Sequence, residues 1–206
     1  VAGVSGGAGI EWTPEMTPDG LTARLSWSPK VSGSGSSDKG SSGTSTGAKN
    51  SGFDVTVEAT DAILGVPGLT LYGGMSETEQ DAAAAAIAGD VKEKTMGAKY
   101  AFGGFTIGYQ WSEEDTGRAS TNTKYENDGY GITFNVNDDL SIGYNHYESE
   151  QSSSTNTTAS ASSVQIAYSM GGASIRLAEA QVDNAKYQTG AGFDRDATTL
   201  SVSLAF

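Results

Sequence analysis

The chain alternates between apolar and polar positions with a period of two. Near its C-terminal end, Leu200, Val202 and Leu204 share one face, and the residues between them share the other. The same alternation recurs in runs of roughly eight to ten residues along the chain, as expected for β-strands with one apolar face. The pattern predicts about eleven strands.

Short and long connections alternate between these runs. The short connections are 13–20, 61–68, 103–104, 137–139 and 171–172. The long connections, rich in Ser, Gly, Thr and acidic residues, are 31–52, 77–93, 112–127, 149–162 and 182–196. The Gly-Gly pairs at 103–104 and 171–172 predict two-residue hairpins, because glycine accepts positive φ. We interpret the long connections as loops, one of which could hold a short helix over Glu79–Ala88.

Aromatic residues gather at both ends of the predicted strands, with aliphatic residues and glycine between them. Those beside short turns are Trp12, Phe102, Phe105, Phe134 and Phe206, and those beside long loops are Trp27, Phe53, Tyr109, Trp111, Tyr130 and Tyr144. Two aromatic belts around an apolar band are typical of a membrane barrel, whereas a sandwich core would hold its aromatics near the strand centres. We therefore predict an all-β, transmembrane, antiparallel up-and-down β-barrel.

The composition narrows the choice of function. The 206 residues include 28 Gly, no Cys and one His, and 25 acids against 12 bases give a net charge of −13. No apolar run approaches the ~18 residues that a spanning helix needs, which leaves strands as the means of crossing. The absence of Cys excludes disulfides and thiolates, a single His argues against a Ser-His-Asp triad, and the acidic balance argues against nucleic-acid binding. We predict that the protein is not an enzyme.

Charged residues on the polar face are candidates for lining a channel. By alternation, they are Glu11, Arg24, Asp54, Glu58, Lys99 and Arg176. We expect them to tune conductance, with the acidic net charge favouring cations by focusing the field.

Further acids cluster in the predicted loops. They are Glu77, Glu79, Asp81, Glu113, Glu114, Asp115, Asp194 and Asp196. Carboxylates are the ligands that Ca²⁺ prefers, so loop-bound calcium that bridges to lipopolysaccharide phosphates is one hypothesis, and loop solubility is the other. We expect no resident cofactor, and we interpret His146 as an interfacial side chain rather than a ligand.

Three segments carry a resemblance to a known family. The hairpins 100–109 and 168–175 and the ending 200–206 resemble those of a Gram-negative general porin of the alphaproteobacterial type, most strongly over 95–206. The resemblance implies a sixteen-stranded homotrimeric diffusion channel for small polar solutes in the outer membrane, in contact with lipid and lipopolysaccharide. It also implies extracellular long loops, a periplasmic C-terminus, and one long loop folded into the lumen. No segment matches that loop, and the place of 77–93 counted from the C-terminus argues against it.

Strand parity bears on how much of a barrel this chain holds. If the last strand ends in the periplasm, eleven strands put residue 1 on the external side, whereas a complete bacterial barrel has an even count. Either one strand is miscounted or N-terminal strands are missing, and we favour the second explanation. Residues 1–206 are then a single domain, the C-terminal portion of a barrel.

Two other functions fit part of the pattern. One is an outer-membrane adhesin or structural barrel with surface-binding loops, which would not conduct ions. The other is a secreted, soluble β-sandwich that binds carbohydrate, which would need no detergent.

Overall fold

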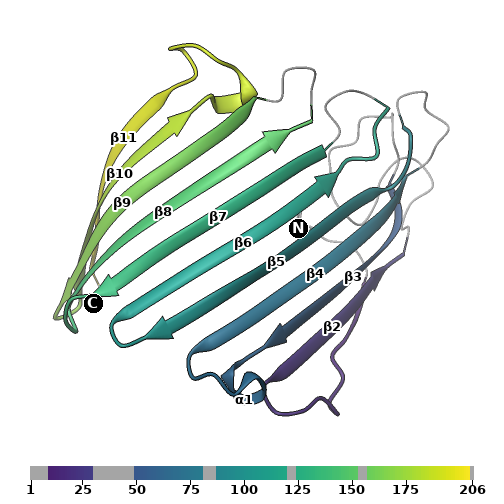
Figure 1. Cartoon of the computed structure of the whole chain (residues 1–206), viewed down its shortest axis with the longest axis horizontal. Helices are drawn as coiled ribbons and strands as arrows, with labels where there is room; N and C mark the ends of the chain where they lie inside the picture. The colour runs from purple at the N-terminus through teal and green to yellow at the C-terminus, as the bar shows by residue number, and fades with distance from the viewer. Residues whose placement is uncertain (1–8, 30–48, 81–86, 120–123, 153–156, 205–206) are drawn as a thin grey trace.

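The computed structural model describes residues 9–29, 49–80, 87–119, 124–152 and 157–204, and they form one antiparallel sheet. Eleven strands follow one another in chain order across the sheet, each paired with the next (Figure 1). They are β1 (Ile10–Trp12), β2 (Leu21–Ser28), β3 (Lys49–Ala59), β4 (Leu69–Gln80), β5 (Val91–Phe102), β6 (Phe105–Asp115), β7 (Lys124–Asn135), β8 (Leu140–Gln151), β9 (Thr158–Met170), β10 (Ala173–Asp183) and β11 (Arg195–Leu204). This is the predicted all-β, up-and-down architecture.

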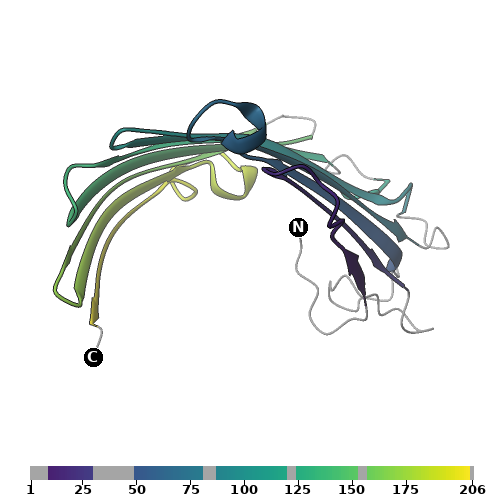
Figure 2. The ribbon, with the colours of Figure 1, turned by 90° about the horizontal axis from the view of Figure 1, so that it is seen from below.

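The sheet curves into an arch (Figure 2). Because side chains alternate along each strand, the register divides them between two faces. The short helical segment η1 (Ala185–Tyr187) lies beneath the arch and contacts polar residues of β7 and β8. The polar face is therefore concave, and the apolar face is convex.

The apolar face has no protein layer over it in the described residues. Val91, the one buried hydrophobic residue of the described part of the chain, lies on the polar face with Glu93. On the apolar face, Ile107, Ile132 and Ile166 are 40–44% exposed in the middle of their strands. A sandwich would bury these side chains against a second sheet. The soluble-sandwich interpretation is therefore wrong for this part of the chain.

The short connections fall where the sequence predicts them. Gly171 and Gly172 both have positive φ, as a type I′ hairpin requires. In the 137–139 turn, the Asn137 carboxamide oxygen accepts hydrogen bonds from the backbone N–H groups of Asp139 and Leu140. The 61–68 connection also contains one unpredicted helical turn, α1 (Asp61–Leu64). None of the helices in the described ranges is long and apolar enough to cross a bilayer.

The strands extend further toward the long loops than the sequence predicts. Glu77 and Glu79 belong to β4, Glu113–Asp115 to β6, and Asp196 to β11, so their assignment to loops is wrong. Polar residues occupy both faces in these segments, which removes the period-two signal while the backbone pairing continues. The possible helix over Glu79–Ala88 is wrong at its start, which is strand, and residues 81–86 lie outside the described ranges.

Candidate functional site

The concave face carries all of the charged residues that were predicted to line a channel. They are Glu11 on β1, Arg24 on β2, Asp54 and Glu58 on β3, Lys99 on β5 and Arg176 on β10. None shares a face with the aromatic belts. This position is what a pore-lining role would require.

Four carboxylates of this face lie at one level of the register. This acidic row comprises Glu11 of β1, Asp54 of β3, Glu93 of β5 and Glu114 of β6. Ser26 donates a hydrogen bond to Asp54 at 2.8 Å, and Ser76 donates one to Glu93 at 2.9 Å. Glu93 and Glu114 were not predicted to line a channel, because the sequence predicts loops there, although both continue the alternation of their strands.

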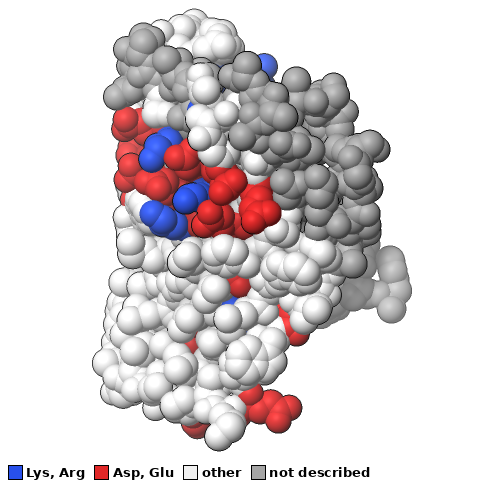
Figure 3. All heavy atoms as spheres, turned by 90° about the vertical axis from the view of Figure 1, so that its right-hand side faces the viewer, with Lys and Arg blue, Asp and Glu red and all other residues white. Residues whose placement is uncertain are grey.

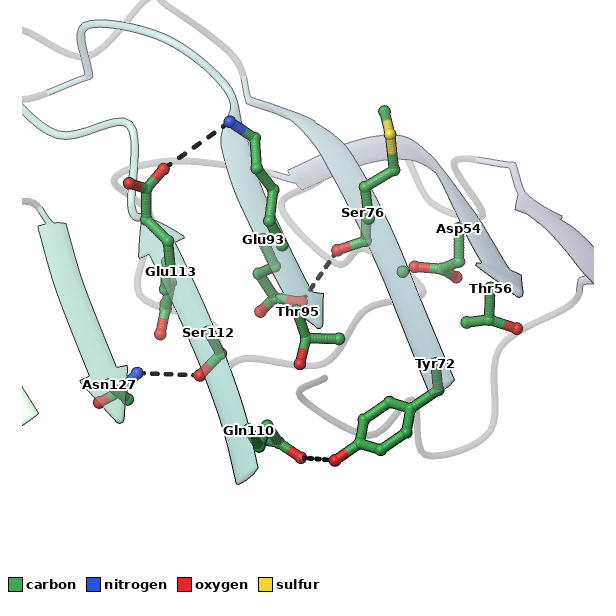
Figure 4. Close-up of a pocket in the computed structure, with 14 residues that line it drawn as sticks. Asp54, Thr56, Tyr72, Ser76, Glu93, Thr95, Gln110, Ser112, Glu113 and Asn127 are labelled. Atoms are coloured by element: carbon green, nitrogen blue, oxygen red, sulfur yellow. Dashed lines mark hydrogen bonds and ion pairs between the residues drawn. The ribbon is translucent and has the colours of Figure 1, made fainter. Parts of the chain in front are cut away.

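A cavity of about 340 Å³ opens beside the acidic row (Figure 4). Hydroxyl, amide and carboxylate groups from β3 to β7 line it. The Tyr72 ring lies across Gly97, and its hydroxyl donates to the Gln110 side-chain oxygen at 3.0 Å. Asn127 donates to Ser112 at 3.2 Å. These groups can exchange hydrogen bonds with water or with a small polar solute.

The next part of the concave wall is uncharged. The inward positions of β7, β8 and β9 carry Asn, Gln, Ser, Thr, Tyr, Ala and Gly. A second cavity, of about 560 Å³, lies between this wall and η1. Beyond it, Arg176 and Arg195 face inward from β10 and β11. The arch turns these strands toward β2 and β3 (Figure 2), so the inward faces of its two limbs are opposed.

The predicted aromatic belts lie on the convex face. Beside the short turns, the rings of Phe102, Phe105 and Phe134 stack in sequence, with centroids 5.6 Å and 4.4 Å apart. Beside the long loops, the Trp111 indole N–H donates to Glu126 at 2.9 Å, and the Tyr109 hydroxyl donates to Asp128. The other described members are Trp12, Trp27, Phe53 and Tyr130, while Phe206 lies outside the described residues. Tyr144 lies on the convex face too, but it pairs with Ile132 in the middle of the apolar band, so its predicted place beside a long loop is wrong. Trp111 and Tyr109 therefore join the apolar band to polar groups, as amphipathic side chains do at a membrane interface.

Charged side chains continue the convex face beyond the belt on the long-loop side (Figure 3). This charged rim comprises Glu77, Glu79, Lys92, Lys94, Glu113, Asp115, Lys124, Glu126, Asp128, Glu148 and Glu150. Cross-strand ion pairs join Lys92 to Glu77 at 3.5 Å, Lys94 to Glu113 at 3.9 Å and Lys124 to Asp115 at 3.4 Å. The rim marks where the convex face passes from an apolar environment to a polar one.

The single histidine belongs to the convex face as well. His146 lies 3.1 Å from Glu148 and packs on the Tyr130 ring, with centroids 5.1 Å apart. Within the described ranges, no three His, Cys, Asp or Glu side chains form a group that could hold a metal ion.

Comparison with known proteins shows the fold. No protein-family model and no curated protein sequence matches the chain. It is similar to the solved anion-selective porin from Comamonas acidovorans, with 13% identity and a TM-score of 0.72 over 96% of this chain and 59% of that one. It is also similar to OmpF of Salmonella typhi, solved in complex with daunomycin, with 11% identity and a TM-score of 0.68 over 95% of this chain and 61% of OmpF.

A mutant of the Rh. blastica porin is a third similar structure, with 16% identity and a TM-score of 0.54 over 96% of this chain and 55% of that one. The chain thus spans about three fifths of the length of these structures. At such identities the similarity establishes the fold, a porin-type β-sheet. It does not distinguish the alphaproteobacterial type from other porins.

Proposed function

We propose that this chain forms part of the wall of an outer-membrane porin, a water-filled channel through which small polar solutes and ions diffuse passively. The observation that supports this proposal is a single curved sheet with two different faces. Its convex face is apolar, has aromatic belts and is not covered by other described residues, and its concave face is polar and charged. The apolar side chains of the convex face then contact lipid, and the polar side chains of the concave face contact water. Neither face then needs a protein core.

The concave face supplies the means of selection. A solute passing along it meets mostly carboxylates, with Arg24 and Lys99 among them, on one limb of the arch and Arg176 and Arg195 on the other. Opposed charges set up a transverse field that favours polar solutes over apolar ones. The hydroxyl and amide groups between them replace hydration water lost in a narrow passage.

The ion preference should be milder than the net charge of −13 suggests. Part of the acidic excess belongs to the charged rim, which lies on the convex face and outside the proposed channel. We therefore expect weak cation preference, measured as a small reversal potential in a salt gradient.

The same asymmetry supports a membrane orientation, and the resemblance to general porins supports an assembly. We place the charged rim and long loops outward, where its lysines meet lipopolysaccharide phosphates, and the stacked phenylalanines and the C-terminal end at the periplasm. Further strands complete the barrel, and the complete protein is a homotrimer, as the resemblance to general porins implies.

The structure favours transport over catalysis. The only histidine in the chain lies on the convex face, so no histidine of this chain can act as a base for the serines of the concave face. The adhesin alternative differs in one respect, because a barrel that serves only to bind surfaces needs no open lumen.

Planar-bilayer recording of the full-length protein, extracted in detergent, tests the proposal. We expect stepwise ionic conductance, together with swelling of liposomes that contain the protein when small sugars are added. A folded, heat-modifiable protein that gives neither signal would defeat the channel and favour the adhesin. A protein that is soluble without detergent would defeat both.

A further inference from the structure

The connection between β10 and β11 folds inward over the concave wall. This inner loop, Asn184–Asp194, contains η1, which lies beneath the arch in Figure 2. The Tyr187 ring packs on Tyr125 of β7, with centroids 5.7 Å apart, and its hydroxyl lies 2.8 Å from that of Ser149 on β8. The sequence analysis treated this connection as an external loop.

A chain of hydrogen bonds anchors the inner loop to three strands. Ser149 donates its one hydroxyl hydrogen to Asn127 at 2.6 Å, so the Tyr187 hydroxyl must donate to Ser149. Asn127 also accepts from Tyr147 and donates to Ser112 of β6. Ser149 is only 6% exposed beneath this contact. Because Tyr187 contacts a buried Ser149 hydroxyl, its side chain packs against the strands of the wall.

The loop backbone is held in an unfavourable conformation. Asn184, Lys186 and Tyr187 all have φ between 53° and 63°, the left-handed region that costs free energy for residues other than glycine. Local hydrogen bonds offset that cost. Asn184 donates from its backbone to Asp194 at 3.1 Å and from its side chain to the carbonyl of Thr158 at 3.1 Å. Such strain persists only where the surroundings determine the conformation, and here it turns Tyr187 onto the wall.

The inner loop also carries a charge into the passage. Lys186 is exposed and lines the 560 Å³ cavity together with Glu114 of the acidic row. The wall beneath the loop is uncharged, so Lys186 is the base that the described structure places over β7–β9. It extends the positive side, formed by Arg176 and Arg195, toward the carboxylates.

We propose that the inner loop is the constriction of the channel, with Tyr187 as its positioning residue and Lys186 as a determinant of ion selectivity. The proposal rests on the porin function above. It identifies the last long connection as a segment that narrows the passage. Ions and small polar solutes then pass between Lys186 and the acidic row.

Single-cysteine labelling tests the charge. Because the chain has no native cysteine, K186C can be treated during recording with methanethiosulfonate reagents of either charge. We expect a stepwise fall in conductance, with the reversal potential shifting toward cations for the negative reagent and toward anions for the positive one. The matched control is K92C, since Lys92 is also exposed but lies in the charged rim.

Removal of the anchor tests the position. Y187F and S149A both delete the Tyr187–Ser149 hydrogen bond, and S149A also deletes the one from Ser149 to Asn127. We expect each variant to raise the mean open-channel current and its noise, with no further rise when Y187F is added to S149A. Y168F is the control, because the Tyr168 hydroxyl lies on the convex face, where it donates a hydrogen bond to the sulfur of Met170 at 3.5 Å.

The outcomes separate this inference from the porin function. If the unmodified channel conducts normally, but full labelling of K186C leaves the conductance and the reversal potential unchanged, the inner-loop constriction alone is overturned. If Y187F and S149A fail to fold, the labelling of K186C alone tests the inner-loop constriction. Absence of any channel in the unmodified protein would overturn both proposals.

Discussion

Individual glycines decide how closely side chains can cross the concave wall. A Cβ at Gly97 would lie 2.4 Å from the Tyr72 ring and 2.7 Å from the backbone oxygen of Tyr109. At Gly108, on the next strand and the same face, the nearest atom is the Ala98 oxygen at 3.7 Å. The two positions look alike in the sequence but differ in the space around them.

G97A should therefore destabilise the folded protein, whereas G108A should not. Overpacking of this kind costs about 1–3 kcal/mol, and we expect G108A to stay within about 0.5 kcal/mol of the parent. Urea unfolding in detergent micelles, followed by tryptophan fluorescence, measures both. Equal unfolding midpoints for the two variants would show that Tyr72 does not lie across Gly97.

At the residue scale, alternation predicted which charges share a face but not what they contact. The inward position of Asp54 follows from its place in a strand, whereas its contact with Ser26 depends on pairing between residues 28 apart. The Tyr187 contact joins residues 38 apart through a loop whose strained backbone has no local sequence signal. The inner loop could not be found before the structure was known.

The long strands have three zones along their length: an apolar band, the aromatic belts at its ends, and a charged segment beyond the belt on the long-loop side. The sequence pattern predicts the first two zones well. The apolar band and the aromatic belts show strict alternation, so their strands, short turns and pairings were predicted. Beyond the belt, Glu77 and Lys92 form an ion pair across β4 and β5 where an apolar residue would sustain the pattern. The backbone hydrogen bonding between the strands continues in this segment, but the alternation of apolar and polar residues does not.

A charge placed within the band distinguishes its two faces. Ile132 pairs with Ile107 on the convex face, and Thr133 pairs with Thr106 on the concave face of the same two strands. I132K should cost about 2–4 kcal/mol of folding free energy, as for a lysine near the bilayer midplane. T133K should cost less than about 1 kcal/mol, because its side chain reaches water. Reversible unfolding into lipid vesicles provides the measurement, and equal losses would contradict a lipid-facing convex side.

The whole sheet has two edges, β1 and β11, and its strand count constrains how they can close. Ten reversals separate these strands, so they run in the same direction, and direct pairing between them would be parallel. An antiparallel barrel therefore needs an odd number of further strands between the edges. Five would complete the sixteen that the resemblance implies, and five is odd.

Closure is needed because unpaired backbone groups cannot remain in lipid. We predict that a structure of the full-length protein in detergent will show β1 and β11 each paired antiparallel with a strand outside Ile10–Leu204. Direct β1–β11 pairing would refute this count.

The central claim is that one face of a single sheet meets lipid and the other meets water. Single cysteines at 132, 133 and 134 of β7 test it directly in liposomes, because the chain has no cysteine of its own. The account predicts that a water-soluble maleimide labels T133C, while I132C and F134C resist it and respond to bilayer-embedded probes. Equal maleimide labelling at all three positions would contradict it.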